Sequence, residues 1–470
     1  MKQYSGLFLA LAYVGFANAY FSMKCAGRIV RERLDPIVNP GRVAGHVHTI
    51  SGGSGFSANM TFEDARASTC SSCPPKQDLS NYWTPQLYVK LKDGTGFRPV
   101  PLVGDSQDRN GGMTIYYLQR PGGDKLTAFP PGFRMLAGDS NKRSTSNDFA
   151  SQAVSFHCLA TDNTETNAIP NHKCSRGLRA QIFFPACWNG KDLDSLDHKS
   201  HVSYPTGAYN NGKCPASHPV HFISIFYEVM YDIARFDSEW VAPDQHPFVF
   251  ANGDATGYGF HGDFVNGWDT NVLQSVIDTC VAHGDRDGDI NDCHPISLYT
   301  DAEMSACKVP VTVDEKVDGK LAKLPGCNTP TYGPERATPP QNCGDNVGFG
   351  PGPSGNKVLT SKGWAYAGCG TDSVSNRAFK GASTASDNMT VESCVDFCAA
   401  RNLPYAGLEY ARECFCAASL APGYVIGQGG ARCDMECAGE EGTWCGGSNA
   451  LSIYQKKAVG RKRGGLLSLV

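Results

Sequence analysis

The sequence predicts a mainly β protein with two folded parts: a body with a β-sandwich or jelly-roll-like core and long loops, and a small disulfide-rich α+β module after it. Three observations lead to this prediction. Short runs of β-branched and aromatic residues, each bounded by Gly, Pro, Asn or Asp, recur through residues 20–327. A stretch rich in Pro and Gly at 328–362 has the composition of a linker. Residues 363–455, called the C-terminal module below, then hold eight of the 20 Cys residues.

The composition limits the classes of function. The 470 residues include 42 basic and 46 acidic side chains, a formal net charge of −4, and this near balance argues against a nucleic acid partner. Hydrophobic residues make up 41% of the chain, enough to bury a sizeable core in about two or three domains, so disorder throughout is excluded. The 52 Gly and 28 Pro residues, with only 19% charged residues, are typical of a chain rich in turns and loops.

Residues 1–19 have the pattern of a signal peptide. Lys2 precedes an apolar run at 7–16, and Ala17-Asn18-Ala19 supplies the small residues that signal peptidase requires, so we expect the mature chain to begin near Tyr20. The run is about half the roughly 20 residues of a membrane span, and no later stretch qualifies. We therefore expect a secreted protein, extracellular or in the cell wall. All 20 Cys follow the cleavage site, which indicates a disulfide framework.

Two other short signals fit export. Asn59-Met60-Thr61 and Asn388-Met389-Thr390 are acceptor sequons for N-glycans, so we expect a glycoprotein. The end of the chain, 456–470, is a basic tail whose final apolar run is too short for a lipid-anchor signal.

Within the body, the pattern predicts strands at four places: 86–91, 113–118, 179–184 and 221–229. Only 270–283 has a helical period, which places Val272, Val276, Ile277 and Cys280 on one face. Several short strands with one helix favour the all-β core stated above.

The spacing of the Cys residues organises the C-terminal module. Cys394 and Cys398 are four apart and share one face of a short predicted helix, for which Thr390 is the expected N-cap. We expect Cys414-Phe415-Cys416 to be a strand that sends its two sulfurs to opposite faces. The spacing leaves the connectivity open. An even set can close the module upon itself, and its members are Cys369, Cys394, Cys398, Cys414, Cys416, Cys433, Cys437 and Cys445.

These Cys residues, with the residues around them, carry a resemblance to a known family. The motifs are 363–369, Cys394 to Cys398, 406–410 leading into 413–416, and Trp444-Cys445-Gly446-Gly447 with 451–454. They resemble the WSC domain, a small disulfide-stapled module of fungal cell-surface and secreted proteins. One departure is Ala417, where the family usually has Gly.

The resemblance implies carbohydrate binding, chiefly to wall glucans. Exposed aromatic rings can stack on the apolar faces of sugars, and in a module this small the same rings can instead form the core. The candidates for sugar binding are Tyr405, Tyr410, Tyr424 and Trp444, with Tyr366 as a further ring.

In the body, the common motifs of enzyme chemistry are missing from the sequence. There is no Gly-rich phosphate loop ending in Lys-Ser or Lys-Thr, no His-Glu-x-x-His and no Gly-x-Ser-x-Gly, which disfavours nucleotide hydrolysis and zinc proteolysis. Cys70-x-x-Cys73 is interpreted as a structural disulfide site rather than a zinc site.

Several segments of the body resemble a second family. They are 33–41, His46-Val47-His48, 80–85, 129–135, 184–190 and 261–264. Together they look like a fungal secreted family catalogued as domain of unknown function 1996. The family name carries no established reaction, but its pairing with a WSC module suggests work at a polysaccharide wall.

Two classes of function remain open for the body. In the first, it is a binding module whose sugar groove uses His46, His48, His261 and Trp268, with wall β-glucan or chitin as the partner. In the second, it is a glycoside hydrolase in which Asp263, Asp269 and Glu228 supply the two carboxyl groups that the reaction needs. The alternative is that these residues have structural roles only. The histidines would then be hydrogen-bonded within the fold, and Asp263 and Asp269 would form turns beside the glycines of 257–269. Three converging histidines would also suit a metal.

The acidic run 285–292 is a candidate calcium site. Asp285, Asp287 and Asp289 alternate along a loop that contains Gly288, and oxygen ligands at alternate positions can converge on Ca²⁺. The spacing departs from an EF-hand, so the alternative is a solvated acidic turn held by Cys280 and Cys293. No other cofactor is expected, and the oligomeric state stays open.

Overall fold

The computed structural model describes residues 20–103, 112–159, 164–280, 290, 293, 295–338, 363–422, 424, 433 and 435–456. The predicted signal peptide, the basic tail after 456 and the candidate calcium residues Asp285, Asp287 and Asp289 lie outside the described residues. The chain forms two compact units. The first comprises 1–29, 49–307 and 329–339, and the second comprises 30–48, 308–328 and 340–470.

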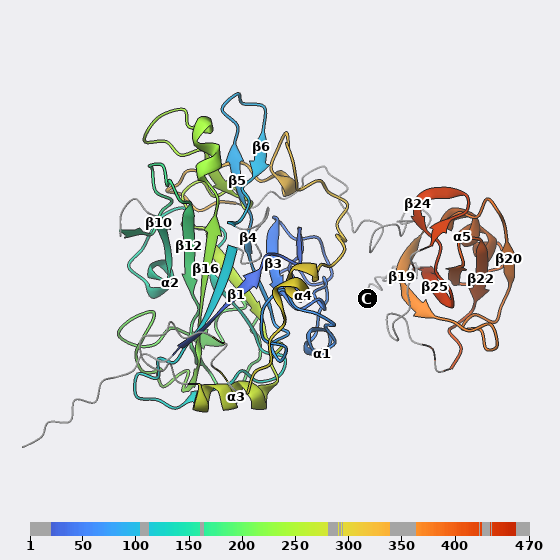
Figure 1. The fold of residues 1–470 in the computed structure, drawn as a ribbon, viewed down its shortest axis with the longest axis horizontal. Coiled ribbons are helices and arrows are strands. Elements are labelled where there is room, and N and C mark those ends of the chain that lie inside the picture. The colour runs from blue at the N-terminus through green and yellow to red at the C-terminus, as the bar shows by residue number, and fades with distance from the viewer. Residues whose placement is uncertain are drawn as a thin grey trace, which may run out of the picture. The chain divides into compact units, whose positions relative to one another are not determined.

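The largest sheet of the first unit is antiparallel. Its order is β1 (Tyr20–Ala26), β7 (Gly112–Leu118), β16 (Ser224–Tyr231), β12 (Leu178–Phe183), β10 (Val154–Cys158) and β11 (Glu165–Thr166). Figure 1 shows β1, β16 and β12 running along one another through the centre of this unit. The strands predicted at 113–118 and 179–184 are confirmed. The run predicted at 221–229 is divided between β15 (Val220–Phe222) and β16.

A second sheet packs face to face on the first. It contains β3 (His48–Gly52), β4 (Asn81–Pro85), β18 (His261–Val265) and β9 (Arg134–Gly138) in that order. Tyr227 of β16 meets Tyr82 of β4 edge to face, at 5.8 Å between ring centroids. Gly262 of β18 lies so close to Phe184 that an added Cβ would stand 3.0 Å from that ring. The mainly β prediction is therefore confirmed, with apolar side chains filling the space between the two sheets.

Smaller elements complete the first unit. Its remaining strands and helices are β14 (Val202–Ser203), β13 (Cys187–Trp188), β8 (Leu126–Thr127), β17 (Phe248–Phe250), β5 (Leu87–Lys90), β6 (Phe97–Pro99), α1 (Phe62–Arg66), α2 (Phe149–Gln152), η1 (Ala234–Glu239), α3 (Thr270–Thr279) and α4 (Asp301–Ala306). The predicted helix 270–283 is α3. It is amphipathic, with Leu273, Val276 and Ile277 buried.

Trp268 anchors the core of this unit. The side chain is wholly buried, and its indole N–H donates to the Tyr117 hydroxyl at 2.8 Å. That hydroxyl lies 2.8 Å from the Tyr82 hydroxyl, which donates to Asp78. Burial raises the pKa of Asp78 to about 6, against the lowering effect of its hydrogen bonds. A buried chain of hydrogen bonds thus satisfies polar groups that would otherwise be costly to bury.

Five disulfides lie within the first unit. They are Cys25–Cys73, Cys70–Cys307, Cys158–Cys174, Cys187–Cys214 and Cys280–Cys293. Cys70 and Cys73 are therefore structural, as predicted, but each is bonded to a distant cysteine rather than to the other. The Cys70–Cys307 bond spans 237 residues.

The predicted linker begins too early. Residues 329–338 belong to the first unit, where the Thr331 N–H donates to the carbonyl of Gly253 at 2.8 Å. Arg336 forms an ion pair with Asp139 at 2.8 Å. Pro and Gly content alone could not reveal these polar contacts, and the described chain resumes at 363.

In the second unit, residues 363–456 form the C-terminal module around a five-stranded antiparallel sheet. Its order is β19 (Trp364–Thr371), β25 (Ala450–Lys456), β21 (Tyr405–Glu409), β22 (Glu413–Ala417) and β20 (Ser383–Ala385). Helix α5 (Val391–Ala399) begins after Thr390, whose side chain accepts from the Ser393 N–H, so the predicted N-cap is confirmed. A small hairpin, β23 (Glu436–Cys437) and β24 (Glu440–Trp444), completes the module.

The eight Cys of the module pair among themselves. The bonds are Cys369–Cys433, Cys394–Cys414, Cys398–Cys416 and Cys437–Cys445. Two of them staple α5 to β22, so Cys414 and Cys416 point to the same side of the strand. The prediction of opposite faces was wrong, because residues i and i+2 of a strand share a face and only Phe415 points the other way.

Segments 30–48 and 308–328 of the second unit are tied together by charged groups. Arg33 pairs with Glu315 at 2.5 Å between Nε and Oε2. Glu32, at the end of β2 (Val30–Glu32), accepts from the backbone N–H groups of Thr312 and Val313 at 2.7 and 2.9 Å. Burial raises the pKa of Glu32 despite these hydrogen bonds.

Two buried carboxyl groups of the module share one guanidinium group. Arg377 donates to Asp372 at 2.7 Å and to Glu409 at 2.6 Å, and its guanidinium carbon lies 4.5 Å from the centroid of the Phe415 ring. Asp372 and Glu409 are both buried. Burial, together with the contact with Asp372, raises the pKa of Glu409 to about 7, although the charge of Arg377 opposes the rise.

We expect this pair to make the module less stable as the pH rises. A carboxyl group whose pKa is raised by folding contributes stability that is full below its unfolded value of 4.5 and is lost as the pH passes about 7. The loss is at most about 3 kcal/mol. The Glu409→Gln variant should remove most of this slope in urea unfolding midpoints measured between pH 4.5 and 8. The exposed Glu436→Gln serves as the control, and equal slopes in the two variants would contradict the prediction.

Candidate functional site

The first unit contains a cavity of about 460 Å³ beside the end of β9. This volume lies within the range of pockets that hold small ligands. Its apolar lining comes from Leu136, Ala137, Ala150, Val154, Pro185 and Val202. Its polar lining comes from Asp139, Lys142, Ser146, Asp148, Ser151, Lys199, Ser203, Tyr204, Tyr258 and Arg336. Residues from distant parts of the chain thus meet here.

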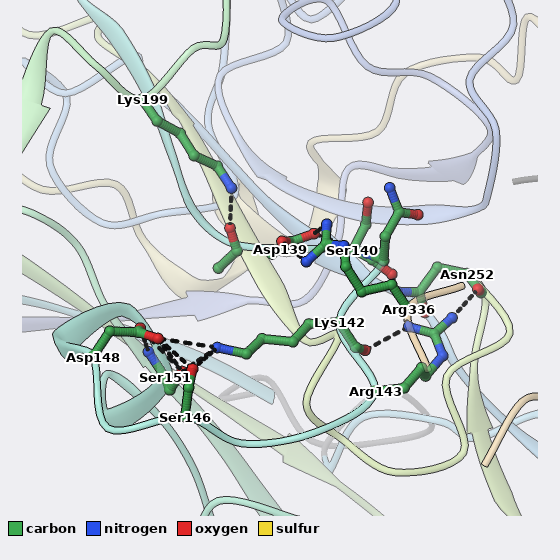
Figure 2. Close-up of polar contacts among 12 residues, drawn as sticks. Asp139, Ser140, Lys142, Arg143, Ser146, Asp148, Ser151, Lys199, Asn252 and Arg336 are labelled. Atoms are coloured by element: carbon green, nitrogen blue, oxygen red, sulfur yellow. Dashed lines mark hydrogen bonds and ion pairs between the residues drawn. The ribbon is translucent and has the colours of Figure 1, made fainter. Parts of the chain in front are cut away.

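One side of the cavity is a cluster around the Lys142 ammonium group, which Figure 2 shows. The ammonium donates to Ser151 and, at 2.7 Å, to Ser146, and it pairs with Asp148 at 3.5 Å. Asp148 is also the N-cap of α2. Although burial raises the pKa of Asp148, hydrogen bonds from Ser146 and Ser151 and the charge of Lys142 bring it to about 2.

This cluster looks like a serine nucleophile beside a lysine base, but its geometry argues against that role. A base must accept the hydroxyl proton. The three N–H groups of Lys142 are matched by three acceptors: Ser146, Asp148 and Ser151. Lys142 therefore braces the segment 142–151 rather than activating Ser151.

The other side of the cavity carries two cations. Arg336 makes two hydrogen-bonded contacts with the carboxylate of Asp139, at 2.8 and 3.1 Å. Burial raises the pKa of Asp139, but the contacts with Arg336, the N–H of Asn141 and the charge of Lys199 outweigh it, so the net shift is downward. The Lys199 ammonium donates to the carbonyl of Gly138 at 2.5 Å, and burial lowers the pKa of Lys199.

A buried guanidinium group supports both sides (Figure 2). Arg143 is 2% exposed and pairs with the equally buried Asp254 at 3.6 Å. Its N–H groups also donate to the Thr331 hydroxyl at 2.6 Å and to the Asn252 carbonyl at 2.8 Å. Burial raises the pKa of Asp254 and lowers that of Arg143, and each charge opposes the shift of the other. Asp254 in turn accepts from the N–H of Gly259 at 2.7 Å.

Two tyrosines give the cavity partly exposed aromatic surface. Tyr258 lies in the loop that Asp254 holds, and its N–H donates to Thr256 at 3.2 Å. Tyr204 donates its hydroxyl to the carbonyl of Phe183 at 3.0 Å, and burial raises its pKa. Aromatic and aliphatic surface beside alternating donors and acceptors is suited to a sugar, whose ring has apolar faces and a hydroxyl edge.

Glu228 does not face the other two predicted catalytic carboxyl groups. Its neighbour Tyr227 donates to the backbone carbonyl of Asp263 at 2.9 Å, so Tyr227 faces β18 and Glu228 points to the opposite side of its strand. There Glu228 pairs with Arg179 at 3.1 Å and accepts from the Tyr116 hydroxyl at 2.8 Å. The predicted partnership across a scissile bond is therefore wrong for Glu228.

Asp269 and Trp268 have structural positions. Asp269 is the N-cap of α3 and accepts from the N–H groups of Asn271 and Val272, which is the turn chemistry considered as its alternative. Trp268 was predicted as a sugar platform, but its side chain has no exposed face for a sugar to stack on. The aromatic residue at the cavity is instead Tyr258, ten positions earlier in the same Gly-rich segment.

Asp263 and His261 lie in the first unit, whereas His46 and His48 lie in the second. Asp263 is buried on β18, opposite the cavity residue Leu136 of β9. His261 lies two positions earlier, with its Nδ1 2.9 Å from the Gly259 carbonyl. In the second unit, the rings of His46 and His48 are 4.3 Å apart. His48 contacts the Leu34 carbonyl at 2.9 Å, and burial lowers its pKa to about 4. A sugar or metal role for these histidines stays a prediction.

In the C-terminal module, Tyr410 is the most exposed of the predicted aromatic residues, at 55%. Tyr405 accepts from Gln455 at 2.8 Å and packs on Phe379, and Tyr424 donates to the Asn376 carbonyl. Trp444 is half-buried at the end of β24, and Tyr366 meets Tyr454 edge to face. Four of the five rings thus also contribute to packing, as the alternative anticipated for a small module.

The cavity itself was missed by the sequence reasoning. Its charged residues come from 139–148, 199 and 336, and none of them belongs to a motif of fixed spacing. The only available signal was the Gly-rich stretch 257–269, which supplies Tyr258. Contacts between segments that are far apart in sequence leave no local pattern.

The structure thus defines a disulfide-rich, mainly β protein with a polar cavity in one unit and a stapled module in the other. Residues 35–268 match the model of the family described as domain of unknown function (DUF1996), and residues 366–447 match the WSC domain. The chain therefore joins a DUF1996 domain to a C-terminal WSC domain, as the sequence motifs indicated.

Curated relatives match over a short span. A WSC domain-containing protein of Arthroderma benhamiae is 42% identical over 94 residues, 20% of this chain and 13% of that protein. A putative fungistatic metabolite of Chaetomium globosum is 40% identical over 92 residues, 19% of this chain and 41% of that protein. Kremen protein 2 of Homo sapiens is 36% identical over 92 residues, 19% of this chain and 20% of that protein. The chain spans less than half the length of each.

These matches suggest a carbohydrate-binding, cell-wall-related role for the module. The many disulfides fit an extracellular protein. In the part of the chain that the structure describes, no helix has the length and apolar character needed to cross a membrane.

Replacing Arg143 should destabilise the first unit strongly. Arg143→Met removes the cation and leaves the buried Asp254 without its ion pair, which typically costs about 3–5 kcal/mol. Urea unfolding of the full chain measures the loss. The control is Arg235→Met, because Arg235 pairs with Asp232 at 2.8 Å with 48% of its side chain exposed, where a loss of no more than about 1 kcal/mol is expected. Similar losses in both variants would refute the supporting role of Arg143.

Proposed function

We propose that this is a secreted protein that binds wall polysaccharide of the glucan type through its WSC module, and that the cavity of the first unit is a second sugar-binding groove. The observation that carries the proposal is the backbone of Tyr410. This exposed aromatic residue lies at the tip of the β21–β22 hairpin with φ at +50°, and Ala411 follows with φ at +65°.

A bulky side chain in this left-handed region is uncommon and costs roughly 1–2 kcal/mol. Gly or Asn is the usual residue at such a position. Strained residues persist where the surrounding structure fixes them, and they cluster at functional sites. The presence of an exposed Tyr at a position where Asn would be less strained therefore favours a role in ligand contact, since its ring adds nothing to the buried core.

The surroundings of Tyr410 suit a sugar. The Ala411 N–H donates to the Cys445 carbonyl at 3.0 Å, so the hairpin tip lies against the segment that directly follows Trp444. Arg412 pairs with Asp387 at 2.7 Å. Aromatic surface with nearby charged donors and acceptors is the combination that recognises sugar rings and their hydroxyl groups.

The second sugar-binding groove, in the cavity of the first unit, is also proposed from aromatic surface beside polar groups. The cavity combines apolar surface from Leu136 and Val202 with the Tyr258 ring and a polar rim. Binding is favoured over glycoside hydrolysis, because hydrolysis needs a carboxyl group that keeps its proton near neutral pH. The two carboxyl groups that line the cavity, Asp139 and Asp148, both have a lowered pKa.

Replacing Tyr410 should weaken glucan binding without destabilising the protein. Tyr410→Asn removes the ring while placing a residue that tolerates a positive φ. Binding of the full chain to insoluble β-glucan, measured by pull-down, should fall at least about fivefold. Stacking of a nucleobase on an aromatic side chain contributes about 1–3 kcal/mol, and we expect a similar energy for a sugar ring, with about 1.4 kcal/mol for each tenfold change in affinity. The melting temperature should stay the same or rise.

Tyr332→Asn is the matched control, because Tyr332 is 60% exposed and lies in the first unit. It should leave glucan binding by the module unchanged. Retained binding in the Tyr410 variant, or no binding of the wild-type protein to glucan or chitin, would reject the proposal.

A further inference from the structure

We propose that the cavity of the first unit takes an acidic sugar unit, one bearing a carboxylate or phosphate group, with the Lys199 ammonium as its anchoring charge. The inference rests on the proposed function, because it names the class of sugar that the second groove binds. Three observations carry it: the hydrogen bonds of the two lysines, the charges of the lining residues and the surface beside them.

The two lysines of the cavity differ in their hydrogen bonds. An ammonium group has three N–H donors. Lys142 has three acceptors in Ser146, Asp148 and Ser151. Among the residues that the structure describes, Lys199 has one acceptor, the Gly138 carbonyl at 2.5 Å. Two donors of Lys199 therefore remain for a ligand.

The charges of the lining residues point the same way. Arg336 and Asp139 compensate each other at 2.8 Å, and Lys142 and Asp148 do so at 3.5 Å. The lining contains three cations and two carboxylates, so its net charge is 3 − 2 = +1. Lys199 is the cation left over.

Carboxylates farther from Lys199 do not replace a ligand. The charges of Asp139, Asp263 and Asp197 all favour the ammonium form, yet burial outweighs them and lowers the pKa of Lys199. Asp197 accepts instead from Ser195, Ser200 and the backbone N–H of Lys199. A charged acceptor in direct contact would form the stronger, charge-assisted type of hydrogen bond.

The rest of the cavity suits the ring of such a sugar. Leu136, Val154 and Val202 provide apolar surface, and Tyr258 adds an aromatic ring. A sugar ring lying on this surface can direct its acidic group to Lys199 and its hydroxyl groups to Ser146 and Asp148. The cavity volume of about 460 Å³ is in the range of small-ligand sites.

The test is calorimetric titration of the full-length, oxidised protein carrying Tyr410→Asn, so that the module does not compete for the probe. The probes are trigalacturonate, its neutral methyl ester and a phosphorylated oligomannoside. At least one acidic probe should bind ten times more tightly than the methyl ester, and the tighter acidic probe identifies carboxylate or phosphate as the source.

Variants then assign the effect to Lys199. Lys199→Met should reduce binding of the acidic probe to the level of the ester, whereas Lys199→Arg should retain it. Lys92→Met, which removes an exposed lysine outside the cavity lining, should change nothing. If Lys199→Met does not fold, the comparison of acid with ester in the parent protein decides, because it needs no variant.

Three results would overturn the inference. Equal binding of acid and ester would reject the acidic sugar but leave a groove for neutral sugars. Unchanged binding in Lys199→Met would reject the anchoring role. Absence of binding by all three probes, the neutral methyl ester included, would reject the groove itself, while glucan pull-down by protein with an intact Tyr410 tests the module separately.

Discussion

The cavity depends on the buried guanidinium group of Arg143. Its donors reach Ser140 and Lys142 in its own segment, Asn252 just after β17, and Thr331 near the end of the first unit. Because the guanidinium fork is planar and rigid, it fixes these segments relative to one another. Asp139 and Lys142 both come shortly before Arg143 in the sequence, so the same anchor positions one charged residue on each side of the cavity. An ion pair outside the cavity lining, between Arg143 and Asp254, therefore holds the lining residues in place.

The C-terminal module achieves rigidity by covalent means. A domain this small buries a limited core, and its disulfides replace part of the missing packing energy by restricting the unfolded chain. The bonds Cys394–Cys414 and Cys398–Cys416 fix α5 on β22. Since β22 is one arm of the hairpin that ends at Tyr410, the staples also hold the strained tip in place. The disulfide-bonded α5 and β22 can therefore hold Tyr410 in its strained, exposed conformation.

Features that depend on neighbouring residues in the sequence were predicted correctly, whereas features that depend on contacts between distant segments were not. Local patterns were sufficient for α5, where a four-residue Cys spacing and a Thr cap coincide, and for the strands at 113–118 and 179–184. Residues whose roles depend on the packing of the two sheets were misjudged. Trp268 lies among glycines that suggested an open loop, and Glu228 lies on a strand whose facing sheet cannot be read from its own sequence. The cavity escaped prediction because its charged side chains come from separate segments.

The bond between Cys70 and Cys307 has a consequence for resistance to proteolysis. Secreted proteases cut exposed loops first, and Leu196, 96% exposed, lies in such a loop of this unit. A cut there leaves Asp139 and Lys199 on different fragments. Both Cys70–Cys307 and Cys187–Cys214 join those fragments across the cut, so a nicked molecule keeps all the walls of its cavity. Limited proteolysis under non-reducing conditions would therefore leave one covalent body, and separate pieces would emerge only after a thiol is added.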